Sequence, residues 1–217
     1  MVDLTRIQNR INYGYGKAAA KLGRLDCAWY RPNSPNNPIS LQTQLGTVVG
    51  QISNKPNFQF SDTSGYAKPT QWGLFDPTDT RPGDYIVYIN NTYFIAAQRA
   101  IQPTMLVACN HVISFVKLVA PVLLGANPYG GRTEANDVPM MNNWPASVLL
   151  GTKGEGTVAH LPADSRAAWW TVLLPSWPGI ILHMGDEFED ETGHRYVVSG
   201  TELTELGWRL ICGQLTT

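Results

Sequence analysis

Two stretches of the chain repeat the same order of hydrophobic and polar positions, and together they indicate its architecture. Residues 83–110 and 185–213 each open with Gly-Asp, continue into an apolar run, and pass through a polar turn. Each then resumes with an aromatic-led run of β-forming residues. Tyr, Phe, Val and Ile favour a pleated, half-buried surface, and Gly-Asp suits a tight turn. Each stretch is therefore predicted to be a meander of about three strands.

The spacing inside the two stretches also agrees. Tyr93 precedes Cys109 by 16 residues, and Tyr196 precedes Cys212 by the same interval. A lone meander cannot bury its apolar face, whereas two packed copies, or meanders curled into small barrels, can. We therefore expect a mainly β fold with two modules of like topology at residues 73–117 and 167–215, with Tyr93 and Tyr196 at equivalent positions. The alternative is that two ordinary hairpins converged on the same residues.

One helix is predicted, over residues 3–24. Its apolar positions recur at intervals near 3.6 residues: Leu4, Ile7, Ile11, Ala18 and Leu22. Asp3 is suited to be its N-cap, and Gly23 to end it. The polar side is basic, with Arg6, Arg10, Lys17, Lys21 and Arg24. That side is either a solvated face or a surface that docks against an acidic partner or DNA.

The chain then divides into four segments. Residues 1–46 hold the helix and an extended arm, because Pro32, Pro35 and Pro38 fix backbone angles and remove hydrogen-bond donors. Such an arm either crosses a subunit boundary or is a surface loop. Residues 47–119 are expected to form the first β module, 120–166 connecting loops, and 167–217 the second β module.

Composition narrows the class of protein. Charged residues make up only 15% of the 217 residues, and the net charge is −1, so general attraction to nucleic acid is not supported. No apolar run is long enough to span a membrane, and the N-terminal residues lack a signal-peptide pattern. The three cysteines, Cys27, Cys109 and Cys212, lack metal-ligand spacing. We expect them to be unpaired, with Cys109 and Cys212 buried.

Candidate chemistry is sparse. Five acids crowd one turn: Asp186, Glu187, Glu189, Asp190 and Glu191. They lack the spacing of a calcium loop and are predicted to form a solvated hairpin that protects a sheet edge. The four histidines (His111, His160, His183 and His194) form no close pair with each other or with cysteine. We therefore predict no catalytic, cofactor-binding or metal-ligating residue, no cofactor and no enzymatic activity.

Tryptophan is abundant, with seven residues. Trp169 and Trp170 are adjacent, so in a strand they point to opposite faces. Packing in the core and at interfaces is the expected use. The alternative is an exposed ring that stacks on a sugar or a base.

At this point a resemblance becomes visible. The runs CAWYRPNSPNNPI (27–39), WGLFDPTDTRPGDYIVYINNTYFIAAQ (72–98) and TELTELGWRLICGQL (201–215) resemble structural proteins encoded among the head-to-tail genes of contractile-tailed bacteriophages. The Gly-Asp modules are also similar to the small β barrels of head-closure, or stopper, proteins. Stoppers are typically shorter, with one barrel.

The resemblance implies a virion component made in the bacterial host cytoplasm and assembled as a homo-oligomeric ring at the neck, as a connector, gateway or collar. Its implied neighbours are the portal, adaptor, tail terminator or tube, with DNA near a lumen and no membrane. The alternatives are a baseplate or tail-initiator subunit, or a Trp-based carbohydrate-binding module. In a ring, the basic helix is expected to meet either the acidic turn of the next subunit or another acidic partner.

Overall fold

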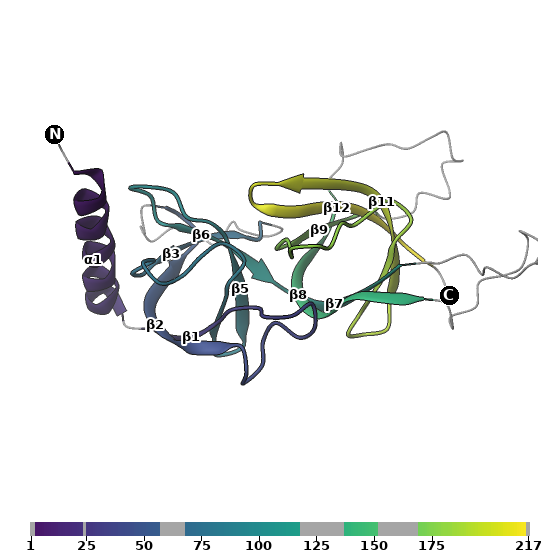
Figure 1. The fold of residues 1–217 in the computed structure, drawn as a ribbon, viewed down its shortest axis with the longest axis horizontal. Coiled ribbons are helices and arrows are strands. Elements are labelled where there is room, and N and C mark those ends of the chain that lie inside the picture. The colour runs from purple at the N-terminus through teal and green to yellow at the C-terminus, as the bar shows by residue number, and fades with distance from the viewer. Residues whose placement is uncertain (1–2, 24, 57–67, 118–136, 152–168, 216–217) are drawn as a thin grey trace, which may run out of the picture.

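The computed structural model describes residues 3–23, 25–56, 68–117, 137–151 and 169–215. Helix α1 (Leu4–Gly23) precedes a first closed barrel, as Figure 1 shows. The strands of that barrel are β1 (Leu25–Tyr30), β2 (Gln44–Ser53), β3 (Thr70–Leu74), β4 (Tyr85–Tyr88), β5 (Asn91–Ala97) and β6 (Thr104–Cys109). A second closed barrel holds β7 (His111–Lys117), β8 (Val138–Leu150), β9 (Trp169–Leu174), β10 (Glu187–Asp190), β11 (Arg195–Thr204) and β12 (Gly207–Gln214).

The two barrels have the same topology. Around the first barrel the strands follow the order β1-β2-β3-β6-β5-β4, and around the second the order is β7-β8-β9-β12-β11-β10. Each strand of the first barrel therefore has a counterpart six strands later. Every pairing is antiparallel, and closure leaves no open sheet edge. The prediction of two β modules of like topology is confirmed.

The Gly-Asp turns are equivalent in detail. Gly83 and Gly185 both have φ of +91°, which favours glycine. The amide of Gly83 donates to the carbonyl of Ile95 at 2.8 Å, and that of Gly185 donates to Val198 at 2.8 Å. Tyr93 pairs with Ile86, and Tyr196 pairs with Phe188, each partner lying two residues beyond the turn aspartate. The predicted equivalence of Tyr93 and Tyr196 is thus confirmed.

The matching Tyr-to-Cys interval, by contrast, does not reflect equivalent cysteines. β5 has a bulge between Ile95 and Ala97, and β11 has the corresponding bulge between Val198 and Gly200. Beside these bulges Ile95 pairs with Leu106, whereas Val198 pairs with Cys212. Cys212 is therefore the counterpart of Leu106, and the equal interval arises because the β11–β12 hairpin is longer. None of the three cysteines forms a disulfide; Cys27 and Cys212 are buried, but Cys109, at the end of β6, is only half-buried.

The predicted segment boundaries need correction. The segment assigned to helix and arm (1–46) contains β1, which closes the first barrel against β2 and β4. β7 falls inside the expected first module (47–119) but belongs to the second barrel. β8 falls inside the expected connecting loops (120–166). Each barrel thus begins earlier in the chain than predicted, because its first strand pairs with a strand distant in sequence.

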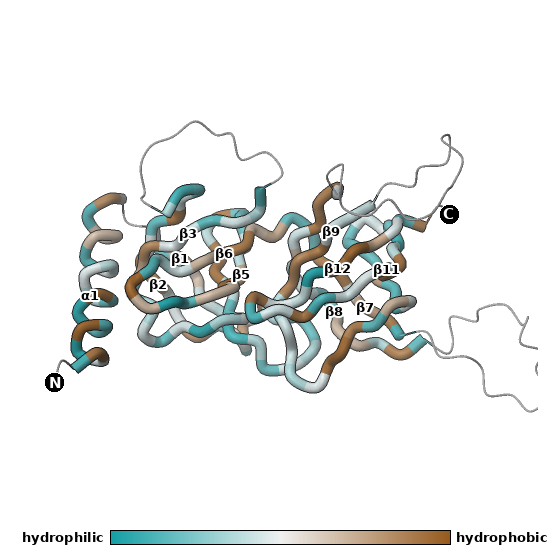
Figure 2. Tube along the Cα trace, turned by 90° about the horizontal axis from the view of Figure 1, so that it is seen from above, coloured by the Kyte–Doolittle hydropathy of each residue, from teal (hydrophilic) through white to brown (hydrophobic). Residues whose placement is uncertain are grey.

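A smaller hydrophobic cluster belongs to the first barrel alone, and the larger one extends through both barrels. Its buried members include Tyr85, Phe94 and Val107 of the first barrel together with Trp144 and Phe188 of the second. The Tyr85 hydroxyl donates to the carbonyl of Pro145 at 2.9 Å, and its ring meets Trp144 edge-on with centroids 6.1 Å apart. Figure 2 shows the barrels side by side, with hydrophobic segments on the strands where they adjoin. The two barrels therefore pack directly against each other.

The proline-rich arm contacts the second barrel of its own chain. The carbonyl of Pro35 accepts hydrogen bonds from Trp144 Nε1 at 2.6 Å and from the amide of Asn142 at 3.0 Å. The amide of Asn37 donates to Asn142 at 2.8 Å. The arm therefore fastens the first barrel to β8 of the second.

Helix α1 forms as predicted, but its inner face is different. The Asp3 carboxylate accepts the amides of Thr5 and Arg6 at 3.0 and 3.3 Å, which confirms the N-cap. The residues that face the first barrel are small or polar: Asn12 and Ala19 are buried, and Tyr15 Oη donates to the carbonyl of Ile101 at 3.0 Å. A gap of about 350 Å³ remains between the helix and the barrel, bordered by Gly16 and Ala20. The apolar stripe of α1 thus lies beside its contact face, not on it.

Candidate functional site

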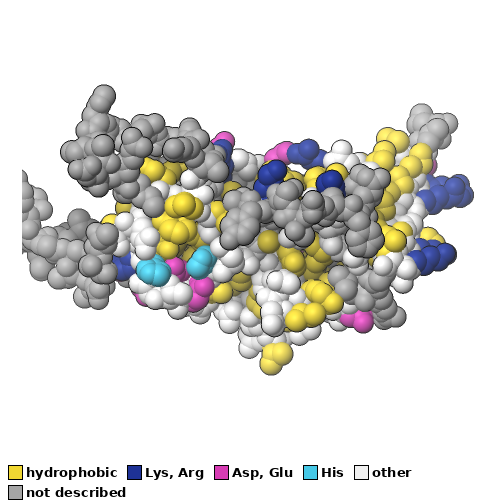
Figure 3. Space-filling model, turned by 180° about the vertical axis from the view of Figure 1, so that it is seen from behind, with side chains coloured by type: hydrophobic (Ala, Val, Ile, Leu, Met, Phe, Trp, Pro, Cys, Tyr) yellow, Lys and Arg dark blue, Asp and Glu magenta, His cyan; other side chains and the backbone are white. Residues whose placement is uncertain are grey.

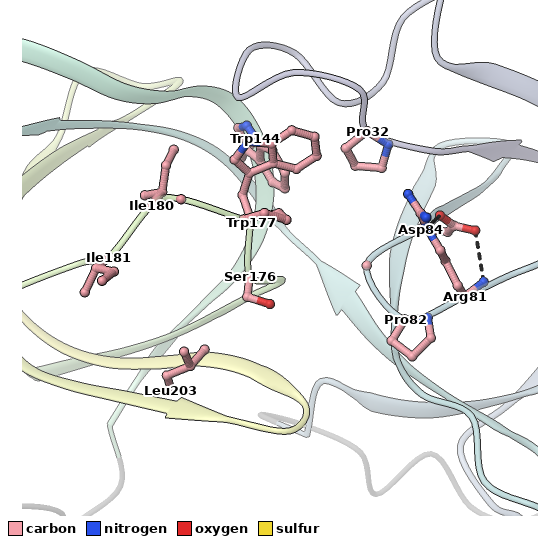
Figure 4. A pocket seen from close by; sticks show the side chains of 13 residues that line it. Pro32, Arg81, Pro82, Asp84, Trp144, Ser176, Trp177, Ile180, Ile181 and Leu203 are labelled. Carbon is pink, nitrogen blue, oxygen red and sulfur yellow. Dashed lines mark hydrogen bonds and ion pairs between the residues drawn. The ribbon is translucent and has the colours of Figure 1, made fainter.

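A groove of about 530 Å³ lies between the two barrels. Five parts of the chain form it: the arm after β1, the turn before β4, strand β8, the loop that joins β9 to β10, and strand β11. Its walls are mainly apolar, as Figure 4 shows: Pro32, Pro82, Trp144, Trp177, Pro178, Ile180, Ile181 and Leu203. Arg81, Asp84 and Ser176 supply the polar side chains.

The carboxylate of Asp84, which borders the groove, is engaged in hydrogen bonds within the fold. Asp84 is completely buried and accepts from Trp29 Nε1 at 2.8 Å and from Arg31 Nε and a terminal nitrogen at 2.9 and 2.8 Å. The amide of Arg81 is a fourth donor, at 3.0 Å. The hydrogen bond with Asp84 raises the pKa of Arg31 further. These contacts join β1 to the turn before β4, so Asp84 has a structural role.

The opposite wall of the groove is aromatic. Trp144 is fully buried, and Trp177 meets it edge-on with ring centroids 5.8 Å apart. The rim carries exposed aliphatic side chains, with Ile181 62% and Leu203 57% exposed. An apolar floor with an exposed apolar rim suits contact with another apolar surface.

The acidic turn is largely neutralised within its own barrel. Asp190 accepts from Thr192 and from the amide of His194, while Glu187 pairs with Arg195 at 3.0 Å. Burial raises the pKa of Asp190, but its hydrogen bonds from Thr192, His194 and Tyr196 outweigh burial and lower it below the ordinary value. Asp186 accepts the amide of His183 at 2.7 Å, and Glu191 accepts that of Val112 at 2.7 Å. Only Glu189 and Glu191 of the five acids are exposed.

The described histidines serve local contacts. His111 Nδ1 lies 3.0 Å from Glu191 Oε1, and His194 Nδ1 lies 2.6 Å from the Thr192 hydroxyl. His183 is exposed, and His160 lies outside the described residues. Within the described ranges no group of three or more His, Cys, Asp or Glu side chains is placed to hold a metal ion. Nor does that part of the chain contain a helix with the length and hydropathy to cross a membrane.

All seven tryptophans are described, and none is exposed. Trp170 meets Tyr196 edge-on at 5.8 Å inside the second barrel, and Trp169 is half-buried. Trp29 donates to Asp84. These positions favour the packing role over a ring presented to a sugar.

Helix α1 has two exposed surfaces, an apolar flank and a basic outer side, and the sequence predicted both as faces of one amphipathic helix. The apolar flank includes Leu4, 78% exposed, Ile7, and Leu22, 62% exposed. The outer side carries the exposed basic residues Arg6, Arg10, Lys17 and Lys21; Arg24 lies outside the described residues. Figure 3 shows these Lys and Arg side chains gathered at the α1 end of the molecule.

The groove itself was not predicted, because its walls come from five separate parts of the sequence. Its one conspicuous sequence signal was the recurrence of Pro beside Trp at residues 175–178. No family model, curated protein or solved structure matches the chain.

Proposed function

We propose that this chain is a non-enzymatic structural subunit of a bacteriophage virion, which assembles into a ring at the neck as a connector, gateway or collar. The observation that carries the proposal is the pair of apolar surfaces on opposite sides of the first barrel. One is the flank of α1, and the other is the rim of the groove between the barrels. Figure 1 shows that α1 lies on the side of the first barrel away from the second.

Such a pair of surfaces suits head-to-tail association. A surface on one side of a subunit that fits a different surface on the next subunit makes a heterologous contact, which closes into a ring when the rotation permits. The hydrophobic cluster that extends through both barrels supports the same proposal, because it holds the two surfaces in a fixed position relative to each other. The resemblance of residues 27–39, 72–98 and 201–215 to head-to-tail proteins adds the viral context.

The charged groups at the groove serve structure rather than reactivity. Asp84 is held by four donors, and Arg31 spans from Asp84 to the carbonyl of Asp79 at 2.8 Å. A buried carboxylate that is already ion-paired is a poor general base, because protonation would break the pair. The surroundings of the groove therefore fit a binding surface within an assembly.

Native mass spectrometry and electron microscopy of the purified full-length chain test the proposal. We expect a defined species of several subunits, with a ring visible in projection, that increases with protein concentration. A chain that stays monomeric across the accessible concentrations, and when mixed with lysate of phage-infected cells, refutes it. Flanking genes for a capsid protein and a tail sheath would favour the neck, whereas flanking baseplate genes would favour the alternative.

A further inference from the structure

The three sides of α1 differ in chemistry, and in the described structure only one of them packs against the first barrel. Asn12, Tyr15 and Ala19 face the first barrel. Leu4 and Leu22 define the apolar flank, which is open to solvent. No described acid pairs with Arg6, Arg10, Lys17 or Lys21 on the outer side, although Lys17 lies over the ring of Tyr13. The helix thus offers an apolar stripe bordered by four unpaired cations.

Charge is divided between the two halves of the molecule. From residue 3 to residue 110 the described chain has nine Lys or Arg and five Asp or Glu; from 111 to 215 it has three and eight. The four cations of α1 account for the positive excess of the first half. The second barrel is therefore the part of another copy that attracts this helix most strongly.

The second barrel also offers a matching apolar strip. Segment 181–190 runs beside β11, since Gly185 bonds Val198 and Glu189 pairs with Arg195. Along it lie the exposed side chains of Ile181, Met184 and Leu203, with Met184 70% exposed. The exposed acids Glu189 and Glu202 lie on the same strands. The ten residues of β11 span about 33 Å, and the twenty residues of α1 span about 30 Å, so the helix can lie along the full length of that strand.

From these surfaces we propose that α1 of one copy docks along segment 181–190 and β11 of a second copy, with its apolar flank on Ile181, Met184 and Leu203. This inference rests on the proposed ring and names its contact. The acid that receives the helix is Glu189, because most of the acidic turn 186–191 is committed to internal hydrogen bonds and Glu202 pairs with Arg209 at 3.6 Å. Within one chain the contact cannot form, since the first barrel separates the two surfaces (Figure 1).

Two variants of the full chain test the contact. The helix variant carries Arg6→Glu, Arg10→Glu and Lys17→Glu; the barrel variant carries Met184→Lys and Leu203→Lys. All five residues are exposed, so we expect both variants to keep the circular dichroism spectrum of the natural chain. The matched control, Lys55→Glu with Lys68→Glu, changes charge on two exposed residues outside α1, next to the ends of β2 and β3.

Native mass spectrometry then separates the outcomes. We expect each variant alone to be monomeric and the control to assemble like the natural chain. A mixture of the two variants retains one intact helix and one intact receiving strip, so it should give a 1:1 dimer that cannot grow. Assembly of either variant like the natural chain, or a mixture that stays monomeric, overturns the contact. Failure of the natural chain itself to assemble instead overturns the proposed function.

Discussion

The twin Gly-Asp turns allow a controlled measurement of how much the buried ion pair stabilises the fold. Asp84 and Asp186 occupy equivalent turns, yet their surroundings differ. Asp84 accepts four hydrogen bonds, two of them from the Arg31 guanidinium, whereas Asp186 accepts the amide of His183. The matched substitutions are Asp84→Asn and Asp186→Asn, which preserve side-chain shape and remove the charge.

The expected magnitudes follow from these contacts. Removing one partner of a buried ion pair costs about 3–5 kcal/mol, and the Arg31 side chain is 27% exposed, so partial hydration reduces that cost. We expect Asp84→Asn to lower the free energy of unfolding by about 3 kcal/mol. Asp186→Asn retains an acceptor for the His183 amide, so we expect a loss of about 1 kcal/mol.

Urea denaturation followed by circular dichroism measures both losses. With an m-value of about 3 kcal/mol/M, the midpoint should fall by about 1 M for Asp84→Asn and by about 0.3 M for Asp186→Asn. Adding Arg31→Met to Asp84→Asn should cost less than the two single losses together, because the double variant leaves no orphaned charge. Equal midpoints for the two asparagine variants, or strict additivity with Arg31→Met, would refute the reasoning.

Three further predictions concern single groups. Burial, with the nearby Asp190 charge, raises the pKa of Tyr196 to about 12. The folded state therefore keeps the phenol proton to a higher pH than the unfolded chain, so the free energy of unfolding should be full below about pH 10 and decline as the pH rises toward 12. Tyr196→Phe should reduce this decline in urea titrations at alkaline pH. Burial raises the pKa of Cys27 to about 11 and of Cys212 to about 12. Iodoacetamide at pH 8 should therefore modify both thiols slowly in the native chain and rapidly in urea. Fast labelling of the native chain, measured by peptide mapping, would contradict this prediction. A Cβ at Gly207, where φ is +116°, would lie 2.5 Å from the carbonyl oxygen of Leu174. Gly207→Ala should therefore lower the thermal unfolding midpoint more than Gly83→Ala, because the space around Gly83 is open. Equal midpoints for the two variants would be inconsistent with that packing.

The parts of the fold that sequence reasoning found are those encoded locally. The Gly-Asp turn, the hairpin of Tyr93 and the N-cap at Asp3 each depend on a few adjacent residues. β8 lies inside the segment predicted as connecting loops, and it contains two prolines, Pro139 and Pro145. The strand tolerates them because its register against β7 shifts twice, and Asn143 has φ of +55°.

The candidate site was harder to predict for a related reason. The role of Asp84 depends on Trp29 and Arg31, more than fifty residues earlier, and these approach it only when β1 pairs with β4. Hydrophobic periodicity does not encode which strands close a barrel. The equal Tyr-to-Cys spacing was misleading for the opposite reason, since a longer hairpin compensated for a different register.

The repeated topology has a consequence for symmetry. Any closed ring of this chain contains twice as many barrels as subunits, and successive barrels alternate between two kinds with the same strand order. In the ring proposed above, a surface common to both barrels would occur twice in every subunit, whereas α1 would occur once.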